Sequence, residues 1–331
     1  ALVDAPEDPA AFEVEQTRKF LGFDVRDFPQ SQGPTGFDEL PADAPEFAFS
    51  LVPQQLSGPE PHASYETRKW IVTKGPDGSE IEAYCSYDRD KEIAPGHPFQ
   101  STRENRRHFY DGGYHPQDVF IGKRVGGQLQ PILFFRDVGS HDTAPHHLAV
   151  DSKGRCHLML ADVDMDQRNR FKLLWVIGDL SAGKWTEAWL VDHRDHFTSW
   201  AHPWSAAWGE TVHLIWDWTD QSHGDPQKGS GIFHVIWTPD GFERKVRVYK
   251  GNVDSLDMAV DPDSGQLLLV FSTEEGVFVA SQPADGPWTL PARLHPEFMR
   301  NYDVSVQALG KGAFVIRTKS KETKEWLLIS K

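Results

Sequence analysis

Three histidines, His141, His146 and His147, lie within one short stretch in the middle of this chain. Imidazole gains and loses a proton near neutral pH without a large pKa shift, so a histidine here could act as a general base or a general acid. We take His147 and His141 as candidate catalytic groups and His146 as a candidate substrate contact.

A second candidate group is basic. Its members are Arg103, Arg106 and Arg107. In a chain with a formal net charge of −15, these guanidinium groups form a local reversal of sign that suits binding of a carboxylate or a sulfate. Tyr114, in the same segment, offers a hydroxyl for proton transfer. We take Arg107 and Tyr114 as catalytic and the other two arginines as substrate contacts, the alternative being that the arginines pair with surface carboxylates.

A repeated phrase indicates how such residues are positioned. The copies are residues 145–150 (PHHLAV), 203–208 (PWSAAW), 255–260 (SLDMAV) and 301–306 (NYDVSV). Each copy reads as a short apolar strand followed by a turn, with Gly154, Gly209, Gly265 or Gly310 in the turn. The copies begin about 50 residues apart, the length of a four-stranded unit. Because a lone sheet leaves edges and a face uncovered, whereas radially packed sheets cover one another, the repeats predict an all-β fold, a β-propeller.

The predicted propeller has five blades, with six or seven as alternatives. The strands predicted for the repeats are 147–151, 156–161, 171–177, 185–191, 204–208, 212–216, 232–237, 245–249, 256–260, 267–271, 276–280 and 290–294. Residues 67–137 supply one more blade. The last repeat has room for only three strands, so we expect the N-terminal strand 47–52 to close it. Residues 1–45 are predicted to form a strap, with a short amphipathic helix at 8–21, and residues 46–331 a single propeller domain.

The innermost strands of a propeller surround a channel, and the loops that lead into them crowd one end of it. Alignment of the repeats places His146, Trp204, Leu256 and Tyr302 in one ring, with His147, Ser205, Asp257 and Asp303 beside them. Alternation along a strand lets only one of these two rings face the channel. The predicted substrate-binding residues are His146, Trp204, His202, Tyr302, Asp303, Asp257, Arg103, Arg106 and Arg136.

Residues 140–158 (SHDTAPHHLAVDSKGRCHL) resemble the histidine-containing repeat of BNR-type, sialidase-like propellers. Secreted polysaccharide lyases and glycosidases belong to that group, so the resemblance implies a propeller that handles carbohydrate. The chain departs from true sialidases, because it has no Ser-x-Asp-x-Gly-x-x-Trp box and no Arg-Ile-Pro segment.

Three functions are compatible with these residues. The first is β-elimination at a uronic acid, in which arginines neutralise the carboxylate while histidine and tyrosine move protons. The second is glycoside hydrolysis, which needs two carboxyl groups roughly 5 Å or roughly 6.5 to 9.5 Å apart, for which we consider Asp257 and Asp303. The third is glycan binding without catalysis, with tryptophans such as Trp204 stacked on sugar faces. We expect a lyase for an acidic polysaccharide.

Composition limits the partners and the location. The net charge of −15 argues against nucleic acid and anionic membranes as partners, and the chain has no apolar run long enough to insert into a membrane. The first residue is Ala1, which fits a mature secreted or periplasmic protein and also a trimmed chain; we expect the former. We expect an oligosaccharide or polysaccharide partner.

No metal or other cofactor is predicted. The alternating carboxylates Asp162, Asp164 and Asp166 resemble the start of a calcium loop, but the glycine and closing glutamate of an EF-hand are missing, so we expect a solvated loop. The two cysteines, Cys85 and Cys156, have no zinc spacing and are expected to be free and buried. Two further histidines, His157 and His213, are predicted to be hydrogen-bonded sheet residues.

Overall fold

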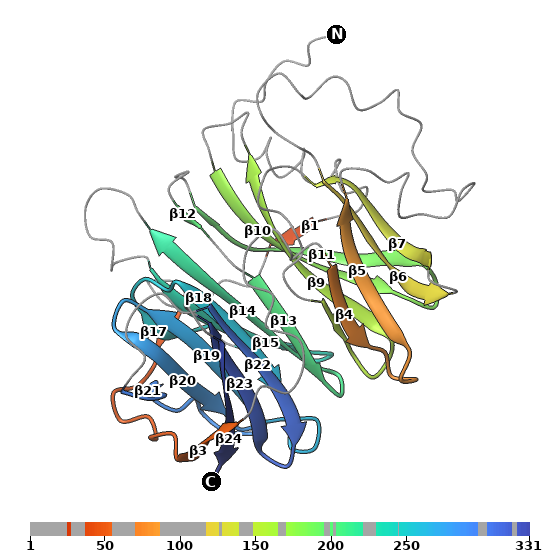
Figure 1. Ribbon diagram of the computed structural model, residues 1–331. Helices are drawn as coiled ribbons and strands as arrows, with labels where there is room; N and C mark the ends of the chain where they lie inside the picture. The colour runs from red at the N-terminus through yellow and green to blue at the C-terminus, as the bar shows by residue number, and fades with distance from the viewer. Residues whose placement is uncertain are drawn as a thin grey trace, which may run out of the picture. The chain divides into compact units, whose positions relative to one another are not determined.

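The computed structural model describes residues 25–27, 37–54, 70–86, 117–125, 128–138, 148–164, 170–194, 199–200, 203–220, 230–243, 245–296, 303–319 and 323–331. These residues form strands and turns, so the fold is all-β as predicted (Figure 1). The chain divides into two compact units. Unit one comprises Ala1–Pro29 and Lys69–Asp195, and unit two comprises Gln30–Arg68 and His196–Lys331. The predicted helix at 8–21 lies outside the described residues.

Unit one contains two antiparallel sheets. The first is formed in chain order by β4 (Trp70–Lys74), β5 (Glu80–Ser86), β6 (Gln117–Val125) and β7 (Gln128–Val138). The second is formed by β8 (Leu148–Val150), β9 (Arg155–Asp164), β10 (Arg170–Asp179) and β11 (Lys184–Arg194). One apolar core joins them, with Ile81 and Leu133 from the first sheet and Leu158 and Val176 from the second.

Unit two contains three sheets. The strands of the first are β13 (Pro203–Trp208), β14 (Thr211–Asp220), β15 (Gly231–Thr238) and β17 (Val246–Lys250), with the two-residue strands β12 (Ser199–Trp200) and β16 (Gly241–Phe242). The second sheet has β18 (Ser255–Val260), β19 (Leu267–Thr273), β20 (Gly276–Gln282) and β21 (Ala292–Arg293). The third has β22 (Asp303–Gly310), β23 (Ala313–Lys319) and β24 (Thr323–Ser330), followed by β3 (Phe49–Gln54).

The pairing of β3 with β24 is the one that the sequence predicts for the last repeat. The two strands are antiparallel, and Leu328 lies opposite Leu51. The N-terminal part of the chain therefore supplies the outer strand of the C-terminal sheet. The predicted strands of the other repeats are also present, although the one expected at 290–294 is reduced to the two residues of β21.

Side-chain alternation explains how the sheets of unit two pack. On β22, Val304, Val306 and Ala308 face the core shared with the β18–β21 sheet. The alternate residues, beginning with Asp303, lie on the opposite face. By contrast, β19 is buried along its whole length, because its sheet has a neighbouring sheet on each side.

The turns that follow the first strand of each sheet contact one another in unit two. Trp208 Nε1 donates a hydrogen bond to the carbonyl of Pro262 at 3.2 Å, and a Cβ added at Gly265 would lie 2.6 Å from the Trp208 ring. In the next turn along, the carboxylate of Asp263 accepts the Lys311 N–H at 3.0 Å. The four predicted turn glycines all have positive φ, which glycine adopts readily. Successive sheets are thus linked turn to turn.

Short strands of the N-terminal segment extend two sheets at their outer edges. In unit one, β1 (Val25–Asp27) pairs in parallel with β11, and Arg26 contacts both Glu187 and the Trp189 ring. In unit two, β2 (Asp38–Glu39) pairs in parallel with β17. These additions cover edges that would otherwise offer unpaired backbone groups.

Candidate functional site

The first strands of the sheets in unit two lie side by side and define the candidate site. Strand β18 contacts both β13 and β22. Strands β18 and β22 run in the same direction, since Ser255 bonds to Val304 and Asp257 bonds to Val306. We call the end at which β13, β18 and β22 begin the start rim. Of the predicted site residues, Trp204 and Asp303 lie at this end of their strands.

Most of the predicted site residues lie outside the described part of the chain. They are Arg103, Arg106, Arg107, Tyr114, His141, His146, His147, His202 and Tyr302. Arg136 belongs to β7, but its side chain is not described. Their mutual distances and their roles therefore stay predictions. For three of them the fold defines which strand follows in the chain. His147 directly precedes β8, His202 precedes β13 and Tyr302 precedes β22.

Trp204 lies inside the core rather than on a binding surface. Its side chain is only 3% exposed and packs with Leu256 and Met258 of the neighbouring sheet. Burial leaves the ring no broad face for a sugar, and packing explains its presence.

Asp257 joins two adjacent strands. Its Oδ1 accepts the backbone N–H of Met258 and its Oδ2 accepts the backbone N–H of Val306, both at 2.8 Å. Ser255, two residues earlier, accepts the N–H of Val304 at 3.1 Å. Asp303 is exposed on the opposite face of β22, across from Lys319 on β23. The carboxylate of Asp257 is thus bonded to two backbone N–H groups, whereas Asp303 is exposed at the start of β22.

A group of residues that sequence reasoning did not assemble lies at the start rim. We call Tyr249, Asp254, Glu274 and Glu275 the acidic rim cluster. The backbone of Asp254 bonds to Ser272 O at 2.9 Å, which holds it beside the β19–β20 turn that carries both glutamates. Burial and the nearby charge of Glu274 raise the pKa of Asp254 above its ordinary value. Burial, followed by the charge of Glu275, likewise raises the pKa of Tyr249.

A carboxyl group with a raised pKa can hold a proton that it later donates, and such groups concentrate at functional sites. The sequence gives one sign of this cluster, because Glu274 and Glu275 stand between an apolar run and Gly276, as expected of a turn. Nothing in that pattern indicates that the turn meets Asp254.

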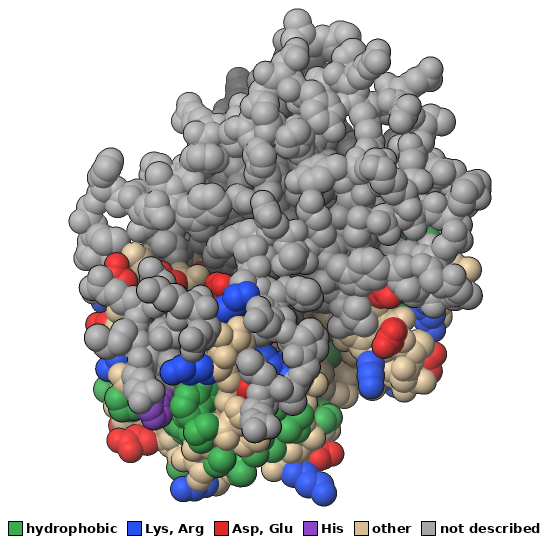
Figure 2. Space-filling view, viewed as in Figure 1, with side chains coloured by type: hydrophobic (Ala, Val, Ile, Leu, Met, Phe, Trp, Pro, Cys, Tyr) green, Lys and Arg blue, Asp and Glu red, His purple; other side chains and the backbone are tan. Residues whose placement is uncertain are grey.

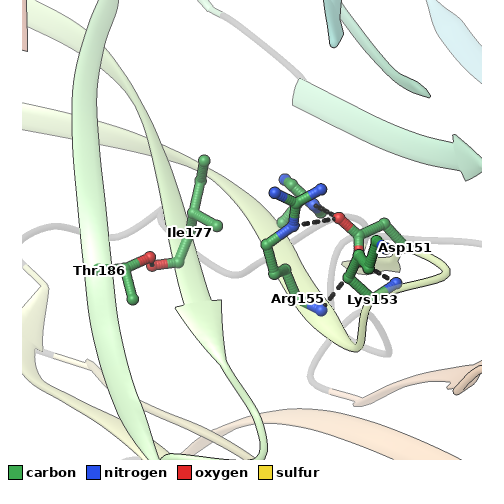
Figure 3. A network of polar contacts seen from close by, with 6 residues as sticks. Asp151, Lys153, Arg155, Ile177 and Thr186 are labelled. Carbon is green, nitrogen blue, oxygen red and sulfur yellow. Dashed lines mark hydrogen bonds and ion pairs between the residues drawn. The ribbon is translucent and has the colours of Figure 1, made fainter. Parts of the chain in front are cut away.

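A polar network in unit one lies at the end of β8, around Asp151 in the β8–β9 turn (Figure 3). The carboxylate of Asp151 accepts Arg155 Nε at 2.6 Å and lies 3.1 Å from His157 Nε2, and its other oxygen accepts backbone N–H groups of the β8–β9 turn. His157 is buried and stacks on Trp175. In unit two, His213 bonds to His234 at 3.1 Å. Both His157 and His213 are therefore hydrogen-bonded sheet residues, as predicted.

Among the residues that the structure describes, no group of three or more histidine, cysteine, aspartate or glutamate side chains is arranged to hold a metal ion. The side chains of Asp162, Asp164 and Asp166 are not among them, so the calcium alternative stays a prediction. Cys156 is free and buried, as expected, while the side chain of Cys85 lies outside the described residues. Within the described ranges, no helix is long and apolar enough to cross a membrane.

No protein-family model matches this chain, and no curated protein matches it. Among solved structures, it is similar to a PL25 ulvan lyase bound to -[GlcA(1-4)Rha3S]-, with a TM-score of 0.49 and 8% identity over 79% of this chain and 67% of that chain. It is also similar to a protein of unknown function from Dyadobacter fermentans, with a TM-score of 0.49 and 12% identity over 79% and 76% of the two chains.

A third similar structure is the WD40 domain of coronin from Toxoplasma gondii, with a TM-score of 0.44 and 10% identity over 79% of this chain and 56% of that chain. The similar structures therefore include a polysaccharide lyase, a WD40 propeller and a protein of unknown function. At these identities and scores they assign no activity, and the BNR-type resemblance stays a prediction.

Proposed function

We propose that the five described sheets are the blades of one propeller, formed by residues 46–331 and bordered by a strap of residues 1–45. Two features support the proposal. The repeated phrase forms the first strand of four sheets in succession. The outer face of the last sheet also exposes the apolar side chains of Val52 and Leu309, as expected of a surface that another sheet covers.

Small-angle scattering tests the single ring. A compact body of this length should have a radius of gyration of about 20 Å. Two separate bodies would give a larger radius and a second maximum in the pair-distance distribution, and that result would refute the ring.

We further propose that the protein cleaves an acidic, uronate-containing polysaccharide by β-elimination. The observation that carries this proposal is the attachment of candidate proton-transfer residues to equivalent strands: His147, His202 and Tyr302 each directly precede the first strand of a sheet. In a propeller those positions lie around the mouth of the channel, where several blades contribute to one pocket.

Each proposed residue has a defined task. Arg107, assisted by Arg103 and Arg106, binds the uronate carboxylate and makes the proton on C5 more acidic. His147 or His141 removes that proton. Electrons of the broken C5–H bond form the C4–C5 double bond, the C4–O4 bond breaks, and Tyr114 protonates the departing oxygen.

The acidic rim cluster makes the arginines necessary to this proposal. Asp254, Glu274 and Glu275 would repel a polyanion, because like charges close together are unfavourable in partly buried surroundings. Positive charge must therefore lie close to the bound carboxylate. We expect Arg107→Ala to raise KM strongly and Arg107→Lys to restore part of the loss, whereas an arginine in a surface ion pair would change neither.

A specific observation favours a second candidate, glycoside hydrolysis. Asp254 has a raised pKa beside Glu274, which is the property expected of a general acid. In that case the acidic rim cluster, rather than the pair of Asp257 and Asp303, would supply the carboxyl groups.

One assay separates the candidates. The protein is incubated with polyuronates and with neutral polysaccharides, and both ultraviolet absorbance and reducing ends are followed. Unsaturated ends that absorb in the near ultraviolet support elimination, and their loss in His147→Ala with an unchanged melting temperature supports the assigned base. Reducing ends without absorbance, lost in Asp254→Asn, would replace elimination by hydrolysis. Binding without any product would leave a glycan-binding propeller.

A secreted or periplasmic location follows from this proposal, because a polysaccharide of the required kind is met outside the cytoplasm. Fractionation of the producing cells tests it. Recovery of the protein only in the cytoplasm would contradict this location.

A further inference from the structure

Two buried histidines and a tryptophan form a hydrogen-bonded chain between two sheets of unit two. Trp288 Nε1 donates to His234 Nδ1 at 2.9 Å, and His234 Nε2 lies 3.1 Å from His213 Nδ1. His213 and His234 belong to β14 and β15, whereas Trp288 belongs to the loop between β20 and β21 of the next sheet. All three side chains are at most 3% exposed.

The chemistry of the three rings fixes where the protons are. An indole N–H can only donate, so Nδ1 of His234 must be the acceptor and the proton of its neutral ring must be on Nε2. That proton is donated to Nδ1 of His213, which therefore carries none. Each imidazole thus uses its unprotonated nitrogen to accept a hydrogen bond.

Protonation of either ring breaks this chain. A proton added to Nδ1 of His234 would face the indole N–H, and a proton added to Nδ1 of His213 would face the Nε2–H of His234. An N–H that faces another N–H is repulsive, and the new charge would be buried. Burial accordingly lowers the pKa of His213 to about 4, and burial together with the charge of His213 lowers that of His234 well below its ordinary value.

Described charged groups on the surrounding strands are directed elsewhere. Lys245 lies over the rings of Trp216 and Phe233, and Arg247 binds Glu39. On the β18 side, Asp257 is bonded to Val306.

Two more acidic residues, Asp217 and Asp285, belong to the elements that carry His213 and Trp288. Asp217 is buried on the same side of β14 as His213, four positions further along the strand, and near Trp288 the loop carries the exposed Asp285. Within the described part of the chain, burial lowers the pKa of His213, and burial together with the charge of His213 lowers that of His234. Among the residues that the structure describes, neither imidazole has an acidic partner that would stabilise its protonated form.

We propose that the His213–His234–Trp288 chain is an acid-sensitive latch that holds the 283–291 loop against the neighbouring sheet and releases it when either imidazole is protonated. The loop in turn contacts the N-terminal segment, since Leu290 N donates to Pro45 O at 2.8 Å and Leu290 forms a bridge with Glu46. Release of the latch would therefore loosen residues 45–46 as well.

The latch is tested by amide hydrogen exchange of residues 281–294 between pH 7 and pH 4, corrected for the intrinsic effect of pH on exchange. Uptake of one proton on opening predicts that protection falls about tenfold per pH unit below pH ~6.5. The double variant His213→Gln/His234→Gln should lack this slope. His295→Gln, which changes a histidine stacked on Trp326 in the same unit, is the matched control and should keep it.

Equal slopes in the wild type and in the double variant would overturn the proposal. If the double variant does not fold, nuclear magnetic resonance of the wild-type protein tests the proposal instead. The latch predicts that the Trp288 indole N–H signal is lost at a higher pH than the far-ultraviolet dichroism of the sheets. A Trp288 signal that persists until the whole protein unfolds would be incompatible with it.

Discussion

The carboxylate of Asp257 on β18 accepts the backbone N–H of Val306 on β22 at 2.8 Å, so one side chain ties the first strands of two adjacent sheets together. With the Met258 N–H on its other oxygen, this aspartate satisfies two donors at once. The group therefore acts as a brace between sheets, a role that accounts for an aspartate in a largely apolar strand.

Replacement of Asp257 should destabilise unit two. Asp257→Ala leaves two backbone donors without their acceptor, and each such loss costs about 1–3 kcal/mol when the group is buried. We expect urea unfolding to show a loss in that range or somewhat above it. Asp257→Asn keeps one acceptor and should lose less, while Asp285→Ala, on an exposed loop, should change little. An Asp257→Asn protein of full stability but without activity would instead give this residue a part in the chemistry.

Gly178 on β10 should not tolerate a side chain. An added Cβ would lie 2.4 Å from Leu133 Cδ1 and 2.8 Å from the Sγ of Cys156. We expect Gly178→Ala to cost about 1–3 kcal/mol, as overpacking of a dense core does. Unfolding in urea measures the loss, and thiol labelling of Cys156 in a Cys85→Ser background reports exposure of the core. Slow labelling and unchanged stability would show that the two sheets of unit one can separate to accommodate a methyl group.

Asp151 should stabilise unit one in a pH-dependent manner. Burial alone would raise its pKa, but hydrogen bonds from His157 and the Arg155 backbone outweigh burial and lower the pKa below 3.8. Because the folded pKa is depressed, the stabilisation is fully present above about pH 4 and fades as the pH falls through the folded pKa. Asp151→Asn should therefore lower stability at pH 7 and match the wild type in strong acid. A penalty independent of pH would indicate lost packing rather than lost charge.

The contact between Arg247 and Glu39 should be measurable by a double-mutant cycle. Arg247 is 6% exposed, lies 4.9 Å from the centre of the Phe37 ring, and donates to both oxygens of Glu39. Glu39 is more than half exposed, so solvent screening should hold the coupling energy to about 1 kcal/mol. Glu39→Ala should also detach β2 from β17, visible as faster amide exchange at Asp38 and Leu40, whose N–H groups donate to the carbonyls of Lys245 and Arg247. Additive single losses would mean that β2 is held by its backbone alone.

The sequence predicts the sheets well because strands and turns leave local signals. Period-two alternation marks Val304, Val306 and Ala308, and glycine marks the turns at Gly154 and Gly265, where positive φ is observed. Even the long-range pairing of β3 with β24 follows from counting the strands in each repeat. The last repeat lacks one strand, and residues 47–52 have the composition of a strand.

Contacts without a local signal could not be predicted. Strands β1 and β2 have three and two residues, too few for any periodicity, and they exist because an outer edge is available to pair with. Alignment of the repeats predicts that Asp257 and Asp303 occupy equivalent positions. It does not predict which backbone N–H lies within reach of each carboxylate. The raised pKa of Asp254 depends on a turn about 20 residues away, and only the folded sheet brings them together.

The β3–β24 pairing also imposes an order of events on biosynthesis. Residues 49–54 leave the ribosome long before their partner strand at 323–330. Throughout translation, β3 and the incomplete C-terminal sheet each carry an edge that could pair with another nascent chain. Removal of residues 323–330 would leave the folded molecule in that same vulnerable condition.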